Sequence, residues 1–165
     1  MRLALYQPDI PQNTGTLIRA GACLGVAVDI IEPCGFLLDD KRLRRSLMDY
    51  AGAAEIVRHL NWDAFMAARP GRVVLVETPL GPDDRPYTDF AFQPGDTLLL
   101  GRESAGTPAA VVAACDARVF IPMVAGVRSL NQAVAASMVL GEALRQTGGF
   151  PTGPSGGVGG GGAAG

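Results

Sequence analysis

The chain has 165 residues, of which 48% are hydrophobic, and its formal net charge is −2. This length suits one domain, and the acidic balance excludes nucleic-acid binding through bulk positive charge, so such a partner would need a local basic patch. The N-terminus becomes polar too early for a signal peptide, and no apolar run of about 18 residues predicts a membrane span. Three cysteines without CxxC spacing and a single histidine predict neither disulfides nor a metal site. We therefore expect a cytoplasmic protein with no membrane partner and no metal.

Six short apolar runs are predicted to be strands. They lie at residues 3–6, 26–31, 55–60, 73–76, 97–100 and 118–123. The first helix is predicted to follow the loop at 10–15 and to end at Gly25. Three more helices are predicted over 62–68 with Asn61 as cap, after Thr107-Pro108, and from about 130 to 146. This alternation, with several strands apolar throughout, predicts an α/β fold with a mostly parallel sheet and helices on both faces. We expect one domain over residues 1–150 and a flexible Gly-rich tail over 151–165.

The sequence NTGTLIR begins the first predicted helix. Asn13 or Thr14 at a helix start is ordinary capping. A second interpretation is an anion site, because the free N–H groups of a helix start bind phosphate. Arg19, about one turn into the predicted helix, would lean back toward them. An arginine among apolar neighbours favours a functional role, but both interpretations stay open at this point.

A basic cluster lies between the second and third predicted strands, in a segment expected to be partly helical. Its members are Lys41, Arg42, Arg44 and Arg45, with Tyr50 following a few residues later. A charge run is usually a solvated face, and a tyrosine often packs in the core. The same residues also suit RNA, because closely spaced cations contact phosphates and a tyrosine ring stacks on a base.

Two polar loops follow the fifth and sixth predicted strands. In LGRESAGTP, Gly101 would let the backbone approach a ligand and Glu103 would supply a fixed charge, although the loop matches neither the Walker nor the GxGxxG pattern. In IPMVAGVRSLNQAVA, Ser129 and the glutamine three residues later have the spacing of a capping box, whereas capping explains Asn131 less well. The last helix is rich in small residues, which would let a partner subunit pack closely. His59 has no partner at catalytic spacing and is expected to be structural.

The order of these motifs resembles that of a known family. NTGTLIR, then LGRESAGTP, then IPMVAGVRSLNQAVA resemble the three motifs of the SPOUT superfamily of RNA methyltransferases. The intervening IIEPCGFLLDDKRLRRSLMDY resembles a narrower group, the short tRNA (cytidine/uridine) 2′-O-methyltransferases that act at the wobble nucleotide. The resemblance extends over roughly residues 1–150.

The resemblance implies a deep trefoil knot near the C-terminus, a homodimer, S-adenosylmethionine as cofactor and the anticodon stem-loop of tRNA as partner. It implies that Arg19 is the catalytic arginine with Asn13 as its companion, and that the basic cluster and Tyr50 contact RNA. The residues assigned to the cofactor are Glu77, Thr78, Gly101, Glu103, Ile121, Met123, Ser129, Leu130 and Asn131. One departure is Gly141, where the family usually has a tyrosine before the glutamate of the last helix.

Three other functions compete with this interpretation. A non-catalytic RNA-binding protein of the same fold would bind RNA without S-adenosylmethionine, but the intact Arg19, Gly101 and Asn131 argue against it. A 2′-O-methyltransferase could also act at another tRNA or rRNA position. A nucleotide-dependent oxidoreductase is disfavoured, because the chain lacks the Gly-rich phosphate fingerprint.

Overall fold

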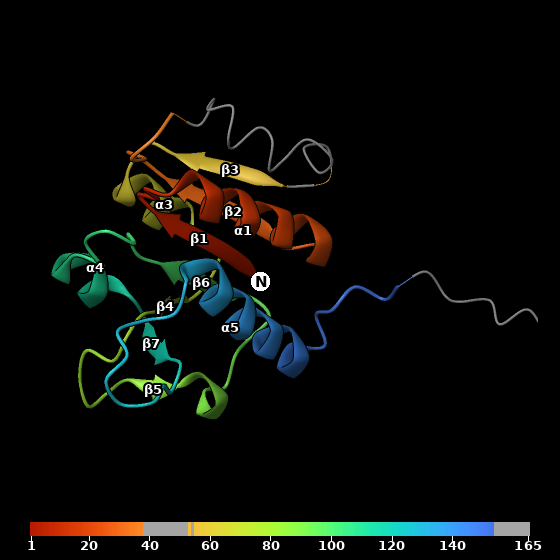
Figure 1. Cartoon of the computed structure of the whole chain (residues 1–165). Helices are drawn as coiled ribbons and strands as arrows, with labels where there is room; N and C mark the ends of the chain where they lie inside the picture. The colour runs from red at the N-terminus through yellow and green to blue at the C-terminus, as the bar shows by residue number, and fades with distance from the viewer. Residues whose placement is uncertain (38–52, 54, 154–165) are drawn as a thin grey trace, which may run out of the picture.

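The computed structural model describes residues 1–37, 53 and 55–153. In this part of the chain, a seven-stranded sheet has the order β3-β2-β1-β6-β4-β7-β5 (Figure 1). The strands are β1 (Arg2–Tyr6), β2 (Ala27–Ile31), β3 (Ile56–His59), β4 (Val73–Val76), β5 (Arg85–Pro86), β6 (Thr97–Leu100) and β7 (Ala117–Phe120). All neighbouring pairs are parallel, so the carboxyl ends of the strands share one edge. The predicted α/β fold with a mostly parallel sheet is confirmed.

Helices cover both faces of the sheet. They are α1 (Pro11–Leu24), α3 (Trp62–Ala68), α4 (Ala109–Ala114) and α5 (Gln132–Thr147), with a short 3-10 helix, η1, at Tyr87–Asp89. Helices α1 and α5 pack on one face, and α3 and α4 on the other (Figure 1). Side chains alternate between these two cores, so that in β1 Leu3 and Leu5 face the α1/α5 side while Ala4 and Tyr6 face the other. Burial on both faces explains why the central strands are continuously apolar.

The predicted strands agree with the observed ones to within a few residues, with two differences. Strand β5 was not predicted, because it has two residues, one of them proline, at the edge of the sheet. Strand β7 ends before Ile121 and Met123, which therefore lie in the loop beyond it. Asn61 does cap α3, and Gly25 does end α1 in the left-handed conformation. The predicted partly helical segment at 39–50 lies outside the described residues.

The predicted starts of α1 and α5 are wrong. Helix α1 begins at Pro11, so Asn13 and Thr14 lie inside its first turn and do not cap it. The Thr14 hydroxyl instead donates to the carbonyl of the N-cap residue at 3.1 Å. Helix α5 is capped by Asn131, whose Oδ1 accepts from two backbone N–H groups of the first turn at 2.9 and 3.2 Å. The capping box predicted for Ser129 is therefore not formed.

His59 is buried between strands and helix α3. Its Nε2 lies 2.8 Å from Oδ1 of Asp29, and its ring packs edge-on against Phe65. Asp29 also accepts from Nε of Arg2 at 2.7 Å. These contacts tie β1, β2 and β3 together, and they account for His59 as a structural residue.

A glycine sets how closely α1 approaches the sheet. A Cβ at Gly21 would lie 2.6 Å from the carbonyl oxygen of Val26 and 2.7 Å from a methyl carbon of Val28, closer than real Cβ atoms come. Gly21 therefore fixes the position of α1, and with it the position of Asn13. In α5, a Cβ at Gly141 would meet nothing within 4 Å among the described residues.

Replacing these two glycines by alanine is expected to have opposite effects. Gly21→Ala forces α1 away from β2 and should lower the free energy of unfolding by about 1–3 kcal/mol. Gly141→Ala restricts the unfolded chain without a clash and should raise that free energy by up to about 1 kcal/mol. Urea unfolding followed by circular dichroism measures both changes, and equal effects at the two sites would contradict this packing.

Candidate active site

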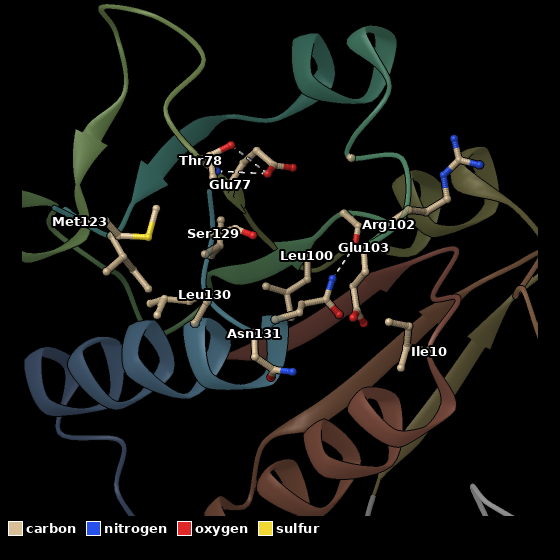
Figure 2. A pocket seen from close by; sticks show the side chains of 16 residues that line it. Ile10, Glu77, Thr78, Leu100, Arg102, Glu103, Met123, Ser129, Leu130 and Asn131 are labelled. Carbon is tan, nitrogen blue, oxygen red and sulfur yellow. Dashed lines mark hydrogen bonds between the residues drawn. The ribbon is translucent and has the colours of Figure 1, made fainter. Parts of the chain in front are cut away.

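A cavity of about 350 Å³ opens at the carboxyl edge of the sheet. This volume lies within the roughly 300–1,000 Å³ of small-molecule sites. Glu77 and Thr78 follow β4, Gly101 follows β6 and Ile121 follows β7, and all four line the cavity (Figure 2). In an open parallel sheet, the edge beyond the carboxyl ends of the strands is the usual place for a ligand.

The nine residues predicted to contact the cofactor all lie in the wall of this cavity. They are Glu77, Thr78, Gly101, Glu103, Ile121, Met123, Ser129, Leu130 and Asn131. The fold therefore brings together three loops that are far apart along the chain, after β4, after β6 and before α5. In the view of Figure 2, Met123 and Thr78 lie toward one end of the cavity, and Glu103 and Ile10 toward the other.

Glu77 is held by its neighbours through both carboxylate oxygens. Its Oε1 accepts from the N–H and the hydroxyl of Thr78, at 3.1 and 3.4 Å, and its Oε2 accepts from the hydroxyl of Thr107 at 3.0 Å. Thr107 was predicted to cap α4, but the N-cap is Pro108, without a side-chain hydrogen bond. The hydroxyl is thus used to fix Glu77 rather than to start the helix.

Gly101 is required by the packing of its own loop. A Cβ there would lie 2.0 Å from Oγ1 of Thr107 and 3.2 Å from Oε2 of Glu77. Its carbonyl oxygen accepts a hydrogen bond from the side chain of Gln132 at 2.5 Å, which ties the end of β6 to the start of α5. From the sequence, Gly101 is expected to let the backbone approach a ligand closely. The structure adds a second reason for a glycine, since a side chain there would clash with Thr107.

Three polar side chains from the three sequence motifs form a hydrogen-bonded chain. Oδ1 of Asn131 accepts from the first turn of α5, which leaves its amide nitrogen as the donor. That nitrogen donates to Oδ1 of Asn13 at 3.1 Å, and Nδ2 of Asn13 donates to Oε2 of Glu103 at 2.5 Å. The cap of α5 therefore fixes the direction of each hydrogen bond, and the chain links α5, α1 and the loop after β6.

Glu103 keeps one carboxylate oxygen without a partner among the described residues. This atom, Oε1, is buried. Burial raises the pKa of Glu103 above its ordinary value of 4.5, the hydrogen bond from Asn13 opposes the rise, and the charge of Asp9 adds to it. A buried carboxylate oxygen without a hydrogen bond is unfavourable, so the fold accepts a free-energy cost at this position.

The predicted catalytic residue, Arg19, does not line the cavity. It is exposed on α1, eight residues after Pro11 and so roughly 12 Å further along the helix axis. The predicted geometry, with Arg19 one turn from the helix start, is wrong because the helix begins earlier than expected. Arg19 instead belongs to an exposed stripe of α1 that also includes Gln12, Thr16 and Cys23.

Beside this stripe, α5 exposes apolar side chains. Val134 is 49% exposed and Met138 is 40% exposed. With Thr16 and Ser137 they border a shallow groove between α1 and α5, which we call the α1/α5 face. The predicted RNA-binding residues are Lys41, Arg42, Arg44, Arg45 and Tyr50, and they lie outside the described residues.

Several wall residues were not predicted from the sequence, among them Ile10, Arg102 and Gln132. Arg102 and Gln132 are the chain neighbours of residues that were predicted, and Gln132 had a capping explanation that hid its contact with Gly101. Ile10 lies in the loop after β1, where the shared carboxyl edge of a parallel sheet could have pointed to it.

Comparison with known proteins identifies the family. The model described as the SpoU rRNA methylase family matches residues 1–141. The chain belongs to the SpoU rRNA methylase family. The tRNA (cytidine(34)-2′-O)-methyltransferases of Beijerinckia indica and Escherichia coli K12 are 56% and 41% identical to it, over 88% and 90% of this chain and 91% and 94% of theirs. The resemblance to the SPOUT methyltransferases, expected from the motifs, is confirmed.

Two solved structures share this fold. One, which addresses the 2-OH methylation of C/U34 on tRNA, matches with a TM-score of 0.79 and 39% identity, over 88% of this chain and 94% of that chain. The other is the SpoU methyltransferase AviRb from Streptomyces viridochromogenes in complex with the cofactor AdoMet, with a TM-score of 0.78 and 29% identity, over 88% of this chain and 60% of that one. Within the described residues, none of the helices has the length and apolar character to cross a membrane. The same residues contain no group of three or more His, Cys, Asp or Glu side chains that could hold a metal ion.

Glu103→Gln is expected to stabilise the fold at neutral pH. A carboxyl whose pKa is raised in the fold contributes stability while it is protonated, and this contribution is lost as the pH rises through the raised pKa. The amide keeps an oxygen for Asn13 but has no charge to desolvate. The free energy of unfolding of the wild type, relative to the variant, should therefore fall as the pH rises above 4.5. Urea titrations across the acidic and neutral range measure it, and a constant difference would contradict the raised pKa.

Proposed function

We propose that this protein transfers a methyl group from S-adenosylmethionine to the ribose 2′-OH of the wobble nucleotide of tRNA, C34 or U34. The observation that carries the proposal is that relatives 56% and 41% identical, over more than 90% of their own length, are tRNA (cytidine(34)-2′-O)-methyltransferases. The structural match to a protein studied for C/U34 methylation supports uridine as a second acceptor. We place this activity in the cytoplasm.

The cavity suits S-adenosylmethionine in size and in chemistry. Ile121, Met123 and Leu130 offer an apolar wall to an adenine ring. The AdoMet complex of AviRb, with which this chain shares its fold, supports the same cofactor. When bound, the cofactor supplies a methyl group already activated on a sulfonium. The trefoil knot implied by the SPOUT resemblance is part of this proposal, with residues 121–145 as its threaded segment.

Arg19 is assigned to the acceptor. A ribose hydroxyl is a poor nucleophile, and negative charge develops on its oxygen as the methyl group is transferred, so a fixed cation beside that oxygen lowers the barrier. The guanidinium stays protonated at any working pH, which suits it to stabilise charge or to hold an adjacent phosphate. The basic cluster at Lys41, Arg42, Arg44 and Arg45 and the ring of Tyr50 are assigned to the tRNA anticodon stem-loop.

A homodimer is needed to bring Arg19 to a cavity that it does not line in its own subunit. The α1/α5 face supports such an assembly, because it carries exposed Val134 and Met138 beside the stripe that holds Arg19. Pairing of this face between two copies would bury those side chains. It would also place Arg19 of one subunit near the site of the other.

Arg19→Ala is expected to keep S-adenosylhomocysteine affinity while the rate of methyl transfer falls at least about 100-fold, the size of one lost charge-stabilising donor. The assay is single-turnover transfer to tRNA, with mass spectrometry of nuclease fragments to locate the 2′-O-methyl group and calorimetry for cofactor binding. Methylation by the wild type at another nucleotide, or none at all, would contradict the proposed function. A near-normal rate for the variant would remove Arg19 from the mechanism.

Met138→Glu is expected to separate the subunits and abolish methyl transfer, because a charge would be buried in the α1/α5 face. Sedimentation velocity reports the assembly and the tRNA assay reports the activity. Leu60→Glu is the matched control, since Leu60 is 82% exposed and does not belong to that face. A wild-type protein that sediments as an active monomer would overturn the dimer.

A further inference from the structure

We propose that Arg102 binds a backbone phosphate of the tRNA substrate next to the acceptor nucleotide, and so helps to hold that nucleotide at the cavity. The inference rests on the proposed function and deepens it by naming a substrate-binding residue. Every ribose inside an RNA chain has a phosphate on its 5′ and 3′ sides, so a phosphate must lie close to the cavity when a 2′-oxygen reaches the methyl group there. Arginine suits this task, because its planar guanidinium can donate to two phosphate oxygens at once.

The charges of the cavity wall single out Arg102. Among the described residues that line the cavity, the charged side chains are Glu77, Arg102 and Glu103. Arg102 is therefore the one cation in this part of the wall. A polyanion that approaches the cavity would find its attractive contact at this side chain.

Arg102 differs from the arginines that stabilise the fold. Six of those in the described chain form ion pairs, namely Arg2, Arg58, Arg69, Arg72, Arg118 and Arg145. Within the described residues, the side chain of Arg102 forms neither a hydrogen bond nor an ion pair. It is nevertheless half-buried. A cation partly withdrawn from water without a counter-ion is unfavourable, so its charge indicates a role in binding rather than in folding.

The free end of Arg102 is open to a ligand. Its Nε atom is buried without a partner in the described chain, whereas its two Nη atoms are not buried. In Figure 2 the side chain extends away from Thr78, Met123 and Ser129, so that its guanidinium lies outside the part of the cavity that these residues line. The packed stem therefore directs the Nη donors outward, where an RNA phosphate rather than the cofactor would meet them.

The turn that carries Arg102 is held in place by backbone and side-chain contacts. The N–H of Gly106 donates to the carbonyl of Arg102 at 2.9 Å, and the two residues form an antiparallel bridge. Between them, the N–H of Ser104 donates to Oδ2 of Asp9 at 3.1 Å, and the hydroxyl of Ser104 donates to the same oxygen. The turn is thus closed on itself and attached to the loop after β1, which makes it a firm base for a binding side chain.

The same loop after β1 also contacts the segment that leads to the basic cluster. The N–H of Gly35 donates to the carbonyl of Pro8 at 2.9 Å, and a Cβ at Gly35 would lie 2.8 Å from the Cβ of Asp9. From Gly35 the chain continues toward Lys41, the first cation of the cluster assigned to tRNA. Asp9 therefore touches both the turn of Arg102 and the segment before that cluster, which supports one shared partner, the RNA.

The first test is the salt dependence of binding to an anticodon stem-loop RNA, measured by fluorescence anisotropy for wild type, Arg102→Gln and Arg102→Lys. Arg102→Gln should weaken binding about tenfold or more, as expected for one lost charge-assisted contact. The slope of log K against log salt should become shallower by about 0.7–0.9, the value for one phosphate. Arg102→Lys keeps the charge but not the planar fork, so the slope should return and the affinity only in part. In the methylation assay, the KM for tRNA should rise while saturating tRNA largely restores the rate.

Arg85→Gln is the matched control. Arg85 is exposed on β5, forms no ion pair among the described residues and does not line the cavity. The variant loses the same charge, so it should leave the affinity and the salt slope close to those of wild type. An equal loss in both variants would show an effect of net charge alone and would overturn the contact.

The second test neutralises the RNA instead of the protein. Stem-loops with a single methylphosphonate, which lacks the phosphate charge, are compared at each position from nucleotide 33 to nucleotide 36. For wild type, one position beside nucleotide 34 should weaken binding about tenfold, and for Arg102→Gln the same change should have little further effect. The absence of such a position for wild type would overturn the proposal without any variant.

Calorimetry distinguishes the phosphate from the other anion at this site, the carboxylate of the cofactor. Arg102→Gln should bind S-adenosylhomocysteine and 5′-methylthioadenosine, which lacks the carboxylate, as wild type does. A loss of affinity for S-adenosylhomocysteine alone would make Arg102 a cofactor ligand and overturn the proposal. A wild type that binds the RNA through Arg102 but methylates no tRNA would instead refute the proposed function, so the two failures are distinguishable.

Discussion

The hydrogen bond between Asn13 and Glu103 joins two motifs that are 90 residues apart, and the rest of the site depends on it. It closes one side of the cavity, between the first turn of α1 and the loop after β6. Its geometry requires that α1 lie close to the sheet, which Gly21 allows. It also requires that Asn131 present its amide nitrogen to Asn13, which follows from its role as the cap of α5. One contact thus reflects the packing of two helices and the path of a loop.

The two carboxylates of the cavity wall show how environment divides roles within one site. Glu77 is saturated by hydroxyl and backbone donors and stabilises the loops after β4 and β6. Glu103 has one oxygen held and one unpartnered among the described residues, and burial raises its pKa. Carboxylates that differ in this way commonly differ in function, because desolvation changes basicity while hydrogen bonding fixes orientation. Burial of Glu103 is thus unfavourable, a feature that is common at functional sites.

Much of the fold could be predicted from the sequence, because the central strands are buried on both faces and so appear as short apolar runs. That the nine assigned residues would meet in one cavity could also be predicted, since each lies just beyond a strand or beside a motif, and parallel strands bring those positions to one edge. The helix starts could not be predicted, because several neighbouring side chains have the chemistry of a helix cap. Thr107 has the chemistry of a cap but its hydroxyl contacts Glu77, and Asn131 rather than Ser129 caps α5.

The position of Arg19 shows a further limit of reasoning from spacing. Helix α1 begins a few residues earlier than predicted, so Arg19 lies more than two turns into the helix instead of about one. In the proposed function, a second subunit and RNA complete the surroundings of Arg19, and a single sequence describes neither of them. Nothing in the described fold requires a glycine at position 141, since a Cβ there would meet nothing within 4 Å.

The most direct test of this account is a crystal structure of the protein with S-adenosylhomocysteine and a tRNA anticodon stem-loop. We expect the thioether in the cavity bounded by Glu77, Gly101 and Leu130. We expect the 2′-oxygen of nucleotide 34 to lie at this cavity, with Arg19 of the partner subunit beside it. A complex in which nucleotide 34 binds away from this cavity, or with its 2′-oxygen away from Arg19 of both subunits, would contradict the proposed function.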